Sequence, residues 1–401
     1  MFQAIGLWAF IAGAVSAKTC YNMTIPVPVT AQNADFGGVQ TPVTNMDATA
    51  LALDASRQGG SGTEGFLTGS KNVSGLYEIS ARYCMPSDTG GNAPTIQILT
   101  HGMGFDKSYW DLPYNNYNYS YVDYALSRGY HTFAYDRLGV GMSSHGDPKE
   151  EIQLPLQIES LAQITRILRN GAVHAGHGHS RRHQKPSKIV HVGHSFGSIL
   201  TYGMSATYPD LSDSLVLTGF SMNSSFMPMF MAGANLQQAR LNRSPGAFSN
   251  PGQDYTLGYL TNADMGNNEY MFLCPGNFDP ELLAFTEKNK QPLTIGELLT
   301  VTSIPTESKF TGPVIIVTGA HDVPFCGGDC LNTGGVSDSI PAAAKPVFPS
   351  AKAFSVVIQP DTAHGINLHY NATAAYKEIA DFLGNHGLIQ QSTEVILEIS
   401  L

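Results

Sequence analysis

One short stretch constrains the fold of this chain more than any other. Residues 188–198, KIVHVGHSFGS, run from an apolar, β-branched strand pattern into the small residues of a tight turn, and an apolar helical pattern follows at 199–208. Gly193-x-Ser195-x-Gly197 therefore has the strand–turn–helix context that presents a serine at the tip of a sharp elbow. The two glycines remove side chains that would collide in the turn. The helix N-terminus beneath the serine offers unpaired N–H groups to a developing oxyanion.

Strand-like and helix-like segments alternate along most of the chain. Strand patterns lie at residues 22–30, 75–84, 95–100, 132–135, 188–192, 214–219, 313–318 and 353–358. Helical patterns lie at 121–128, 152–170, 199–208 and 372–383. Pro155 fits the second of these only if it lies in the first turn. The alternation predicts an α/β fold with a mostly parallel sheet covered by helices on both faces, opened by an antiparallel strand pair.

The strand rhythm is lost between residues 220 and 311 and returns at 313. A chain of 401 residues is long for one simple core. The length suits a core with one large insertion.

The first 17 residues resemble a secretory signal peptide. The apolar run ends in Ala14-Val15-Ser16-Ala17, which places small residues where a signal peptidase cleaves, and the run is too short to span a bilayer. Asn-x-Ser/Thr acceptor sites for glycans begin at Asn22, Asn72, Asn118, Asn223, Asn242 and Asn371. We therefore expect a secreted glycoprotein, and no other stretch reads as a membrane span.

The chain has 5 cysteines, which should mostly pair in an oxidising compartment. Cys20 and Cys84 lie on the two early strands, and a bridge between them would stabilise the fold by roughly 4 kcal/mol. Cys326 and Cys330 can close a small loop, which would leave Cys274 free. Alternatively, Cys274 pairs with one of these two cysteines. A zinc site at Cys326 and Cys330 lacks a second pair of ligands.

Charge argues against some classes of partner. Charged residues make up 13% of the chain and the formal net charge is -10, which is unfavourable for binding nucleic acid or an anionic membrane. A segment before the elbow is rich in histidine and contains His174, His177, His179 and His183. These residues could bind a metal ion, but a solvated loop is the simpler interpretation.

An elbow serine needs a base and an orienting carboxylate, and in this architecture they follow the serine in the order acid, then histidine, each after a late strand. Asp322 follows the strand at 313–318, and His364 follows the strand at 353–358. We therefore predict that Ser195 attacks, that His364 transfers its proton and that Asp322 orients the imidazole. Nearby competitors for the two supporting roles are His321, His369, Asp329 and Asp361.

The oxyanion would be bound by two backbone N–H groups. One should belong to Phe196, the residue after the serine, and the other to the loop after the third strand. Met103 is the candidate in that loop, because Gly102 and Gly104 on either side of it let the backbone approach a substrate carbonyl. Losing such a donor typically costs about 100- to 1000-fold in rate.

Taken together, these motifs resemble the α/β-hydrolase fold superfamily. The matching motifs are His101-Gly102-Met103-Gly104, Tyr135-Asp136-Arg137-Leu138-Gly139-Val140-Gly141, Gly193-His194-Ser195-Phe196-Gly197, Gly319-Ala320-His321-Asp322 and Ala363-His364-Gly365. The chain is most similar to secreted fungal-type hydrolases of the esterase and epoxide-hydrolase-like branch, over about residues 90–385. The resemblance implies an eight-stranded-type sheet and structural roles for Asp136 and Arg137. Epoxide hydrolases carry Asp at the elbow, so Ser195 favours acyl chemistry.

The resemblance also implies a cap inserted in the core. The family's cap position matches residues 220–311, which leaves 18–219 and 312–401 as the core. Met and Phe are frequent at the start of this insertion and suit an adaptable apolar wall over the serine. The pocket residues that we expect are Phe226, Met227 and Phe230, with Trp110 downstream of the oxyanion loop.

The sequence thus predicts a secreted serine hydrolase that cleaves a carboxylic ester or lactone of a mainly apolar small molecule, without a cofactor. Two other functions stay open. A biosynthetic enzyme could use the same three side chains for acyl transfer, cyclisation or product release. A non-catalytic binding protein could be built on the same scaffold.

Overall fold

The computed structural model describes residues 18–57, 62–87, 93–171, 185–248 and 255–389. Three features of the sequence analysis lie outside these residues. They are the expected signal peptide, the histidine-rich segment with His174, His177, His179 and His183, and the end of the chain from residue 390.

The core is an eight-stranded sheet in the order β1-β2-β4-β3-β5-β6-β10-β11. Its strands are β1 (Thr19–Asp35), β2 (Gly69–Met85), β3 (Thr95–Thr100), β4 (His131–Tyr135), β5 (Lys188–His194), β6 (Ser214–Thr218), β10 (Pro313–Gly319) and β11 (Ala353–Gln359). The pairs β1–β2 and β2–β4 are antiparallel and all other neighbours are parallel. The predicted fold class is confirmed, and each predicted strand is present.

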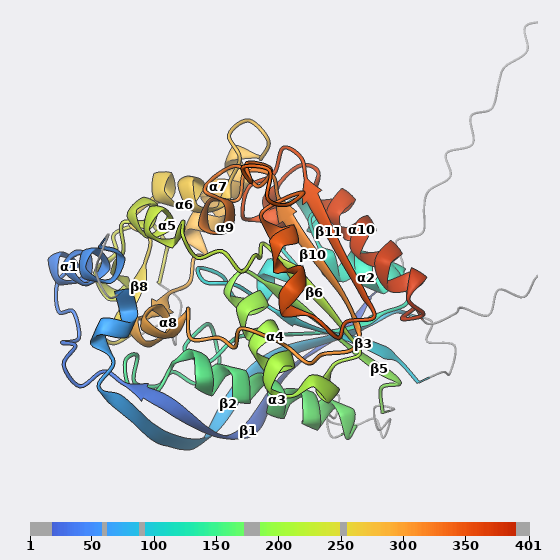
Figure 1. Ribbon diagram of the computed structural model, residues 1–401, viewed down its shortest axis with the longest axis horizontal. Coiled ribbons are helices and arrows are strands. Elements are labelled where there is room, and N and C mark those ends of the chain that lie inside the picture. The colour runs from blue at the N-terminus through green and yellow to red at the C-terminus, as the bar shows by residue number, and fades with distance from the viewer. Residues whose placement is uncertain (1–17, 58–61, 88–92, 172–184, 249–254, 390–401) are drawn as a thin grey trace, which may run out of the picture.

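Helices cover both faces of this sheet (Figure 1). On one face lie α2 (Tyr121–Ser127) and α10 (Ala372–Asn385), and on the other α3 (Leu154–Arg169) and α4 (Phe196–Thr207). Along β10, Ile315 and Val317 pack on the face covered by α2 and α10, whereas Val314 and Ile316 pack on the face covered by α3 and α4. Because successive side chains of a strand point to opposite faces and both faces are buried, these strands are continuous apolar runs in the sequence. Pro155 lies in the first turn of α3, as predicted.

The antiparallel pair is longer than the sequence indicated. β1 and β2 pair from Thr19 opposite Met85 to Asp35 opposite Gly69. The chain between them carries α1 (Asn45–Ser56) and the short helix η1 (Gly62–Phe66). This excursion had no counterpart in the sequence analysis.

Residues 220–311, which we call the cap, lie between β6 and β10. They form α5 (Met227–Ala234), α6 (Met265–Phe272), α7 (Pro280–Lys288) and α8 (Ile295–Thr300), together with a three-stranded antiparallel sheet of β7 (Gln237–Gln238), β8 (Tyr259–Thr261) and β9 (Leu293–Thr294). Figure 1 shows α1 beside α5. Gln238 links the two parts, since its backbone N–H donates to Asn45 Oδ1 at 3.0 Å and its side chain to the carbonyl of Pro42 at 2.8 Å. The cap therefore packs against the segment between β1 and β2, which is a separate stretch of chain.

Short helical elements complete the described fold. They are η2 (Lys107–Trp110), η3 (Asn115–Tyr117), η4 (Pro209–Leu211), η5 (Ala239–Leu241), α9 (Val323–Cys326), η6 (Pro341–Val347) and η7 (Ile366–Leu368).

The cysteines form two bridges, Cys20–Cys84 and Cys326–Cys330, and Cys274 is free and buried. The alternative in which Cys274 pairs with either of the late cysteines is therefore wrong. The bridge between Cys326 and Cys330 also removes the thiolates that a zinc site would need.

The six glycan acceptor asparagines differ in their surroundings. Asn22, Asn72 and Asn118 are exposed. Asn223, Asn242 and Asn371 are half-buried, and their side-chain amides make hydrogen bonds within the protein. Within the residues that the structure describes, none of the helices combines the length and the apolar composition that crossing a bilayer would take.

Candidate active site

The elbow places Ser195 between the end of β5 and the first residue of α4. Ser195 has φ 55, a region that side-chain-bearing residues rarely adopt, and its N–H donates to the carbonyl of Thr218 at 2.9 Å. A Cβ at Gly197 would lie 2.0 Å from the carbonyl oxygen of Thr100. The motif therefore needs this glycine because α4 begins in contact with the neighbouring strand.

The structure brings Ser195, His364 and Asp322 together at the carboxyl edge of the sheet. Ser195 Oγ lies 2.7 Å from His364 Nε2, and His364 Nδ1 lies 2.6 Å from Asp322 Oδ2. The imidazole and the carboxylate are both fully buried. With Nδ1–H donating to Asp322, Nε2 is free to accept the proton of the Ser195 hydroxyl, which is the arrangement a general base requires.

None of the competing residues joins the series Ser195–His364–Asp322. His321 is exposed, with Nδ1 at 3.2 Å from the carbonyl of Gly328. Asp361 is an exposed turn residue with φ 51, and Asp329 is exposed and accepts from the N–H of Leu331. His369 is buried close to His364, but its ring makes hydrogen bonds with backbone groups.

The N–H groups of Met103 and Phe196 have no acceptor among the described residues. The loop that carries Met103 comes close to the serine, since a Cβ at Gly102 would lie 2.9 Å from the Cβ of Ser195. Such a close approach is possible only for glycine. The site therefore offers two unused backbone donors next to the serine, as an oxyanion requires.

Buried polar side chains hold the loop of Met103 in place. His101 lies with Nδ1 at 2.9 Å from the carbonyl of Gly102, and its Nε2 accepts from the N–H of Arg137 at 3.0 Å. Burial, followed by the nearby charge of Arg137, lowers the pKa of His101 well below its usual value, so its ring stays neutral. Asp136 accepts from the N–H and from Nζ of Lys107. These contacts support the structural roles expected for Asp136 and Arg137.

Arg137 also connects the core with the cap. Its guanidinium forms a fully buried ion pair with Glu297 of α8 and lies 4.7 Å from the ring centroid of Phe196. Gln157 of α3 donates to the same carboxylate at 2.6 Å. Removing either charge would leave the other buried without an opposite charge.

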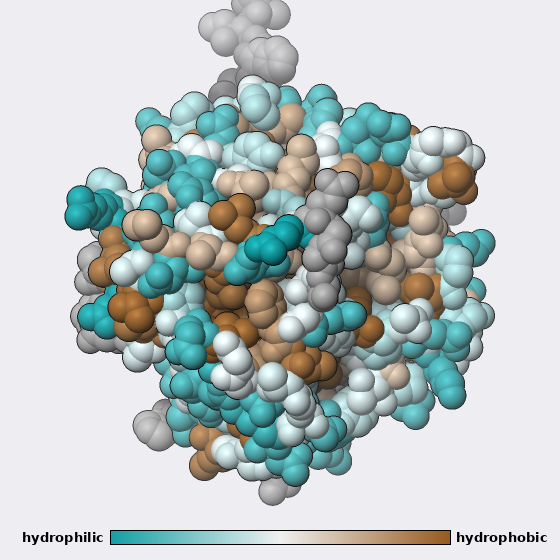
Figure 2. Space-filling view, turned by 60° about the vertical axis from the view of Figure 1, so that its left-hand side comes forward, coloured by the Kyte–Doolittle hydropathy of each residue, from teal (hydrophilic) through white to brown (hydrophobic). Residues whose placement is uncertain are grey.

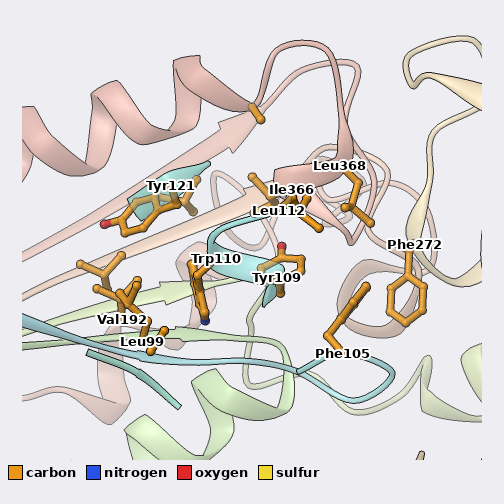
Figure 3. Packing of buried hydrophobic residues seen from close by; sticks show 14 of the residues in the cluster. Leu99, Phe105, Tyr109, Trp110, Leu112, Tyr121, Val192, Phe272, Ile366 and Leu368 are labelled. Carbon is orange, nitrogen blue, oxygen red and sulfur yellow. The ribbon is translucent and has the colours of Figure 1, made fainter. Parts of the chain in front are cut away.

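Tyr109, rather than Trp110, approaches the reacting groups. Its ring stacks on His194 at 4.4 Å, and the ring of His194 lies 5.0 Å from that of His364. Trp110 is fully buried and packs edge-on against Tyr109 and Tyr121 (Figure 3). Trp110, which we expected in the substrate pocket, lies in the hydrophobic core together with Tyr109.

The cap supplies an aromatic wall to the histidine. Phe230 and Phe272 each lie with ring centroids 6.0 Å from that of His364, and Phe272 is nearly parallel to it. Phe325 of the core packs on a further side at 5.7 Å. Phe226 lies against Gly327, and Met227 is half-buried near the same place. Phe272 was not predicted from the sequence, because it stands at the end of a helix of mixed polar and apolar composition with no signal that separates it from core.

Two cavities are near or on the cap. One, of about 170 Å³, is lined by Phe220, Met222, Met227, Ile304 and Phe325 among others. A larger groove of about 1190 Å³ lies on the outer face of the cap, between α1, η5, α6 and α7. Figure 2 shows one face of the molecule, on which apolar residues gather in a hollow. The smaller cavity shares Phe325 with the wall around His364.

Comparison with known proteins identifies the family. A family model described as "Alpha/beta hydrolase family" matches residues 97–378. The chain belongs to the α/β hydrolase family. Comparison with curated proteins finds no match.

Several solved structures resemble this α/β hydrolase at low sequence identity. A thermophilic esterase from Thermogutta terrifontis is 15% identical with a TM-score of 0.48, over 78% of this chain and 95% of that chain. Est1E from Butyrivibrio proteoclasticus, solved with ferulic acid bound, is 14% identical with a TM-score of 0.44, over 77% and 96%. An epoxide hydrolase from Vigna radiata is 15% identical with a TM-score of 0.46, over 77% and 95%. These likenesses carry no argument about the reaction.

Proposed function

We propose that this α/β hydrolase is a secreted serine hydrolase that cleaves a carboxylic ester or lactone of a mainly apolar small molecule. The observation that carries the proposal is the hydrogen-bonded series Ser195–His364–Asp322, with distances of 2.7 and 2.6 Å. It lies beside the two unused N–H groups of Met103 and Phe196.

This geometry supports the following reaction. His364 Nε2 takes the proton of Ser195 Oγ–H as the oxygen attacks the substrate carbonyl carbon. The carbonyl oxygen becomes an oxyanion, which accepts from the N–H groups of Met103 and Phe196. His364 then gives its proton to the departing alkoxide and later activates the water that releases the acid from Ser195. Asp322 keeps the imidazole in the required tautomer and stabilises its charged form.

The surroundings of His364 favour an apolar substrate. Phe230, Phe272 and Phe325 pack on its ring, and Phe325 also lines the cavity of about 170 Å³ together with Met227. Apolar walls with a few convergent polar groups are typical of small-molecule sites. The proposal of secretion is supported by the signal-like residues 1–17 and by the two disulfides, since disulfides persist in oxidising compartments.

A fluorophosphonate probe tests the proposal directly. It should label the wild-type protein at Ser195, and Ser195→Ala should abolish labelling. Ser225→Ala, an exposed serine at the start of the cap, is the control and should be labelled like the wild type. A folded wild-type protein that takes up no label would contradict the proposal.

The substrate is then narrowed with p-nitrophenyl esters of graded acyl length and a panel of lactones. We expect activity on uncharged, apolar members of the series. A strong preference for charged substrates would contradict the apolar site.

A further inference from the structure

The histidine loop, residues 363–371, contains a second buried imidazole that the proposed reaction does not use. His369 is fully buried. Its Nε2 accepts from two backbone N–H groups, that of Cys274 at 2.9 Å and that of Ala363 at 3.2 Å. Its Nδ1 lies 2.9 Å from the carbonyl oxygen of Gly365. Ala363 and Gly365 are the two residues on either side of His364, whereas Cys274 belongs to the cap.

These contacts show which ring nitrogen of His369 carries the proton. Nε2 can accept from two N–H groups only when it carries no proton, so Nδ1 carries the proton and donates to Gly365. Burial lowers the pKa of His369 to about 4, and the nearby His321 acts in the same direction, whereas hydrogen bonds with Gly365 and Ile366 raise it. The ring therefore remains neutral under ordinary conditions.

Other contacts also join the histidine loop to the cap segment around Cys274. The N–H of Gly365 donates to the carbonyl of Phe272 at 2.8 Å, and the N–H of Tyr370 donates to the carbonyl of Asn277 at 3.1 Å. The ring of Phe272 packs nearly parallel to that of His364. Residues 272–277 of the cap therefore run along the histidine loop. The hydrogen bond between His369 and Cys274 lies between these two backbone hydrogen bonds.

We propose that His369 is a positioning residue, which sets the place of His364 relative to Ser195 by binding both neighbours of His364 and the cap at once. The proposal rests on the function proposed above. His369 acts through the backbone, because its three hydrogen bonds are made to main-chain groups. It also makes the cap segment at Cys274 part of the support of the proposed base.

Loss of this support should affect the rate more than substrate binding. A misplacement of about 1 Å in a reacting group can cost on the order of 100-fold in rate. We therefore expect His369→Phe, which fills the space without making the hydrogen bonds, to lower kcat and the rate of fluorophosphonate labelling by about 10- to 100-fold. KM should change less than kcat.

His191 offers a matched control. It is also fully buried, and its ring nitrogens lie 2.9 Å from Thr165 Oγ1 and 2.9 Å from Ser212 Oγ, which belong to neither the histidine loop nor the cap. His191→Phe should destabilise the fold in a similar way and leave kcat near the wild-type value. If His191→Phe lowers kcat as much as His369→Phe, or if His369→Phe keeps the wild-type kcat, the positioning role is wrong.

Two conservative variants separate the two kinds of hydrogen bond and serve if His369→Phe does not fold. A Gln side chain can place an acceptor where Nε2 lies, whereas an Asn side chain reaches only to the position of Nδ1. His369→Gln should therefore recover more activity than His369→Asn, because only Gln can still bind Cys274 and Ala363. Equal activities, or the reverse order, would overturn the proposal.

Two measurements keep this test separate from that of the proposed function. Hydrogen exchange at the amides of Cys274 and Ala363 should rise in His369→Phe and stay unchanged in His191→Phe. The low-field proton resonance of the His364–Asp322 hydrogen bond should shift in His369→Phe alone. If the wild type is inactive and unlabelled, the proposed function fails, whereas unchanged exchange and an unchanged resonance would overturn the role of His369.

Discussion

The elbow of Ser195 and the histidine loop carry side chains that lie 2.7 Å apart, yet the protein holds them in different ways. The elbow is fixed by its own glycine and by contacts with adjacent strands at Thr100 and Thr218. The histidine loop is fixed by distant partners, because His369 binds a residue 95 positions away and Asn367 binds Tyr109, 258 positions away. The elbow also packs on a distant strand at Thr100, but its need for glycine is written in a short motif, whereas the side-chain hydrogen bonds of His369 and Asn367 to distant segments become visible only in the fold.

The largest expected effect comes from changing Asp322, the carboxylate at one end of the series Ser195–His364–Asp322. Asp322→Asn should keep the fold, because the two side chains have the same shape, but should lower kcat by about 10,000-fold since the imidazole loses its orienting carboxylate. Steady-state kinetics on the best ester substrate measures this. Asp361→Asn, which changes an exposed turn aspartate between β11 and the histidine loop, should keep the wild-type kcat. Similar losses in both variants would show that the acid has been assigned wrongly.

The next effect concerns the elbow. Gly197→Ala would force a Cβ to within 2.0 Å of the carbonyl of Thr100, so the turn must open or the protein must unfold. We expect a loss of more than about 4 kcal/mol in the free energy of unfolding, measured by urea denaturation, together with loss of labelling. At Gly38 a Cβ would meet nothing within 4 Å, so Gly38→Ala should be nearly neutral. A stable, labelled Gly197→Ala protein would show that the elbow is less constrained than the motif indicates.

The outcome of sequence reasoning follows the same division. The eight strands, the start of α3 near Pro155 and the placement of Ser195, Asp322 and His364 after their strands could be predicted, because each depends on periodicity or on a short motif. Three features could not. Tyr109 and Trp110 are adjacent aromatics, and the sequence does not show that both are buried in the core. Phe272 and His369 matter through contacts between segments far apart in the chain, and α1 joins the cap from a region that reads as a connection.

Phe272 provides a smaller effect on the cap side of the histidine loop. Phe272→Ala should remove the ring that packs on His364 and Phe105, at a cost of about 3 to 4 kcal/mol in the free energy of unfolding. It should also lower kcat, because the cap segment beside the loop loses its packing. Phe310, at the end of the cap, is buried in the cluster on the other face of the sheet and not against the histidine loop, so Phe310→Ala should cost similar stability with no such effect on kcat. Equal kcat values for the two variants would mean that the cap does not support the loop.

The smallest effect is a dependence of stability on pH that the buried histidines impose. The pKa of His369 is lowered, chiefly by burial, from 6.5 to about 4, so between these values the unfolded chain binds a proton that the folded chain does not. The contribution of His369 to the free energy of unfolding is therefore fully present above about pH 6.5. It is lost as the pH falls toward 4, by about 3 kcal/mol. Urea denaturation at pH 7.5 and at pH 4.5 measures the change. His369→Phe cannot bind this proton and should lose less stability on acidification than the wild type, whereas Phe310→Ala should lose as much as the wild type does. If the wild type and His369→Phe lose the same stability, His369 is not held neutral by the fold, and its two accepted hydrogen bonds do not join the cap to the loop.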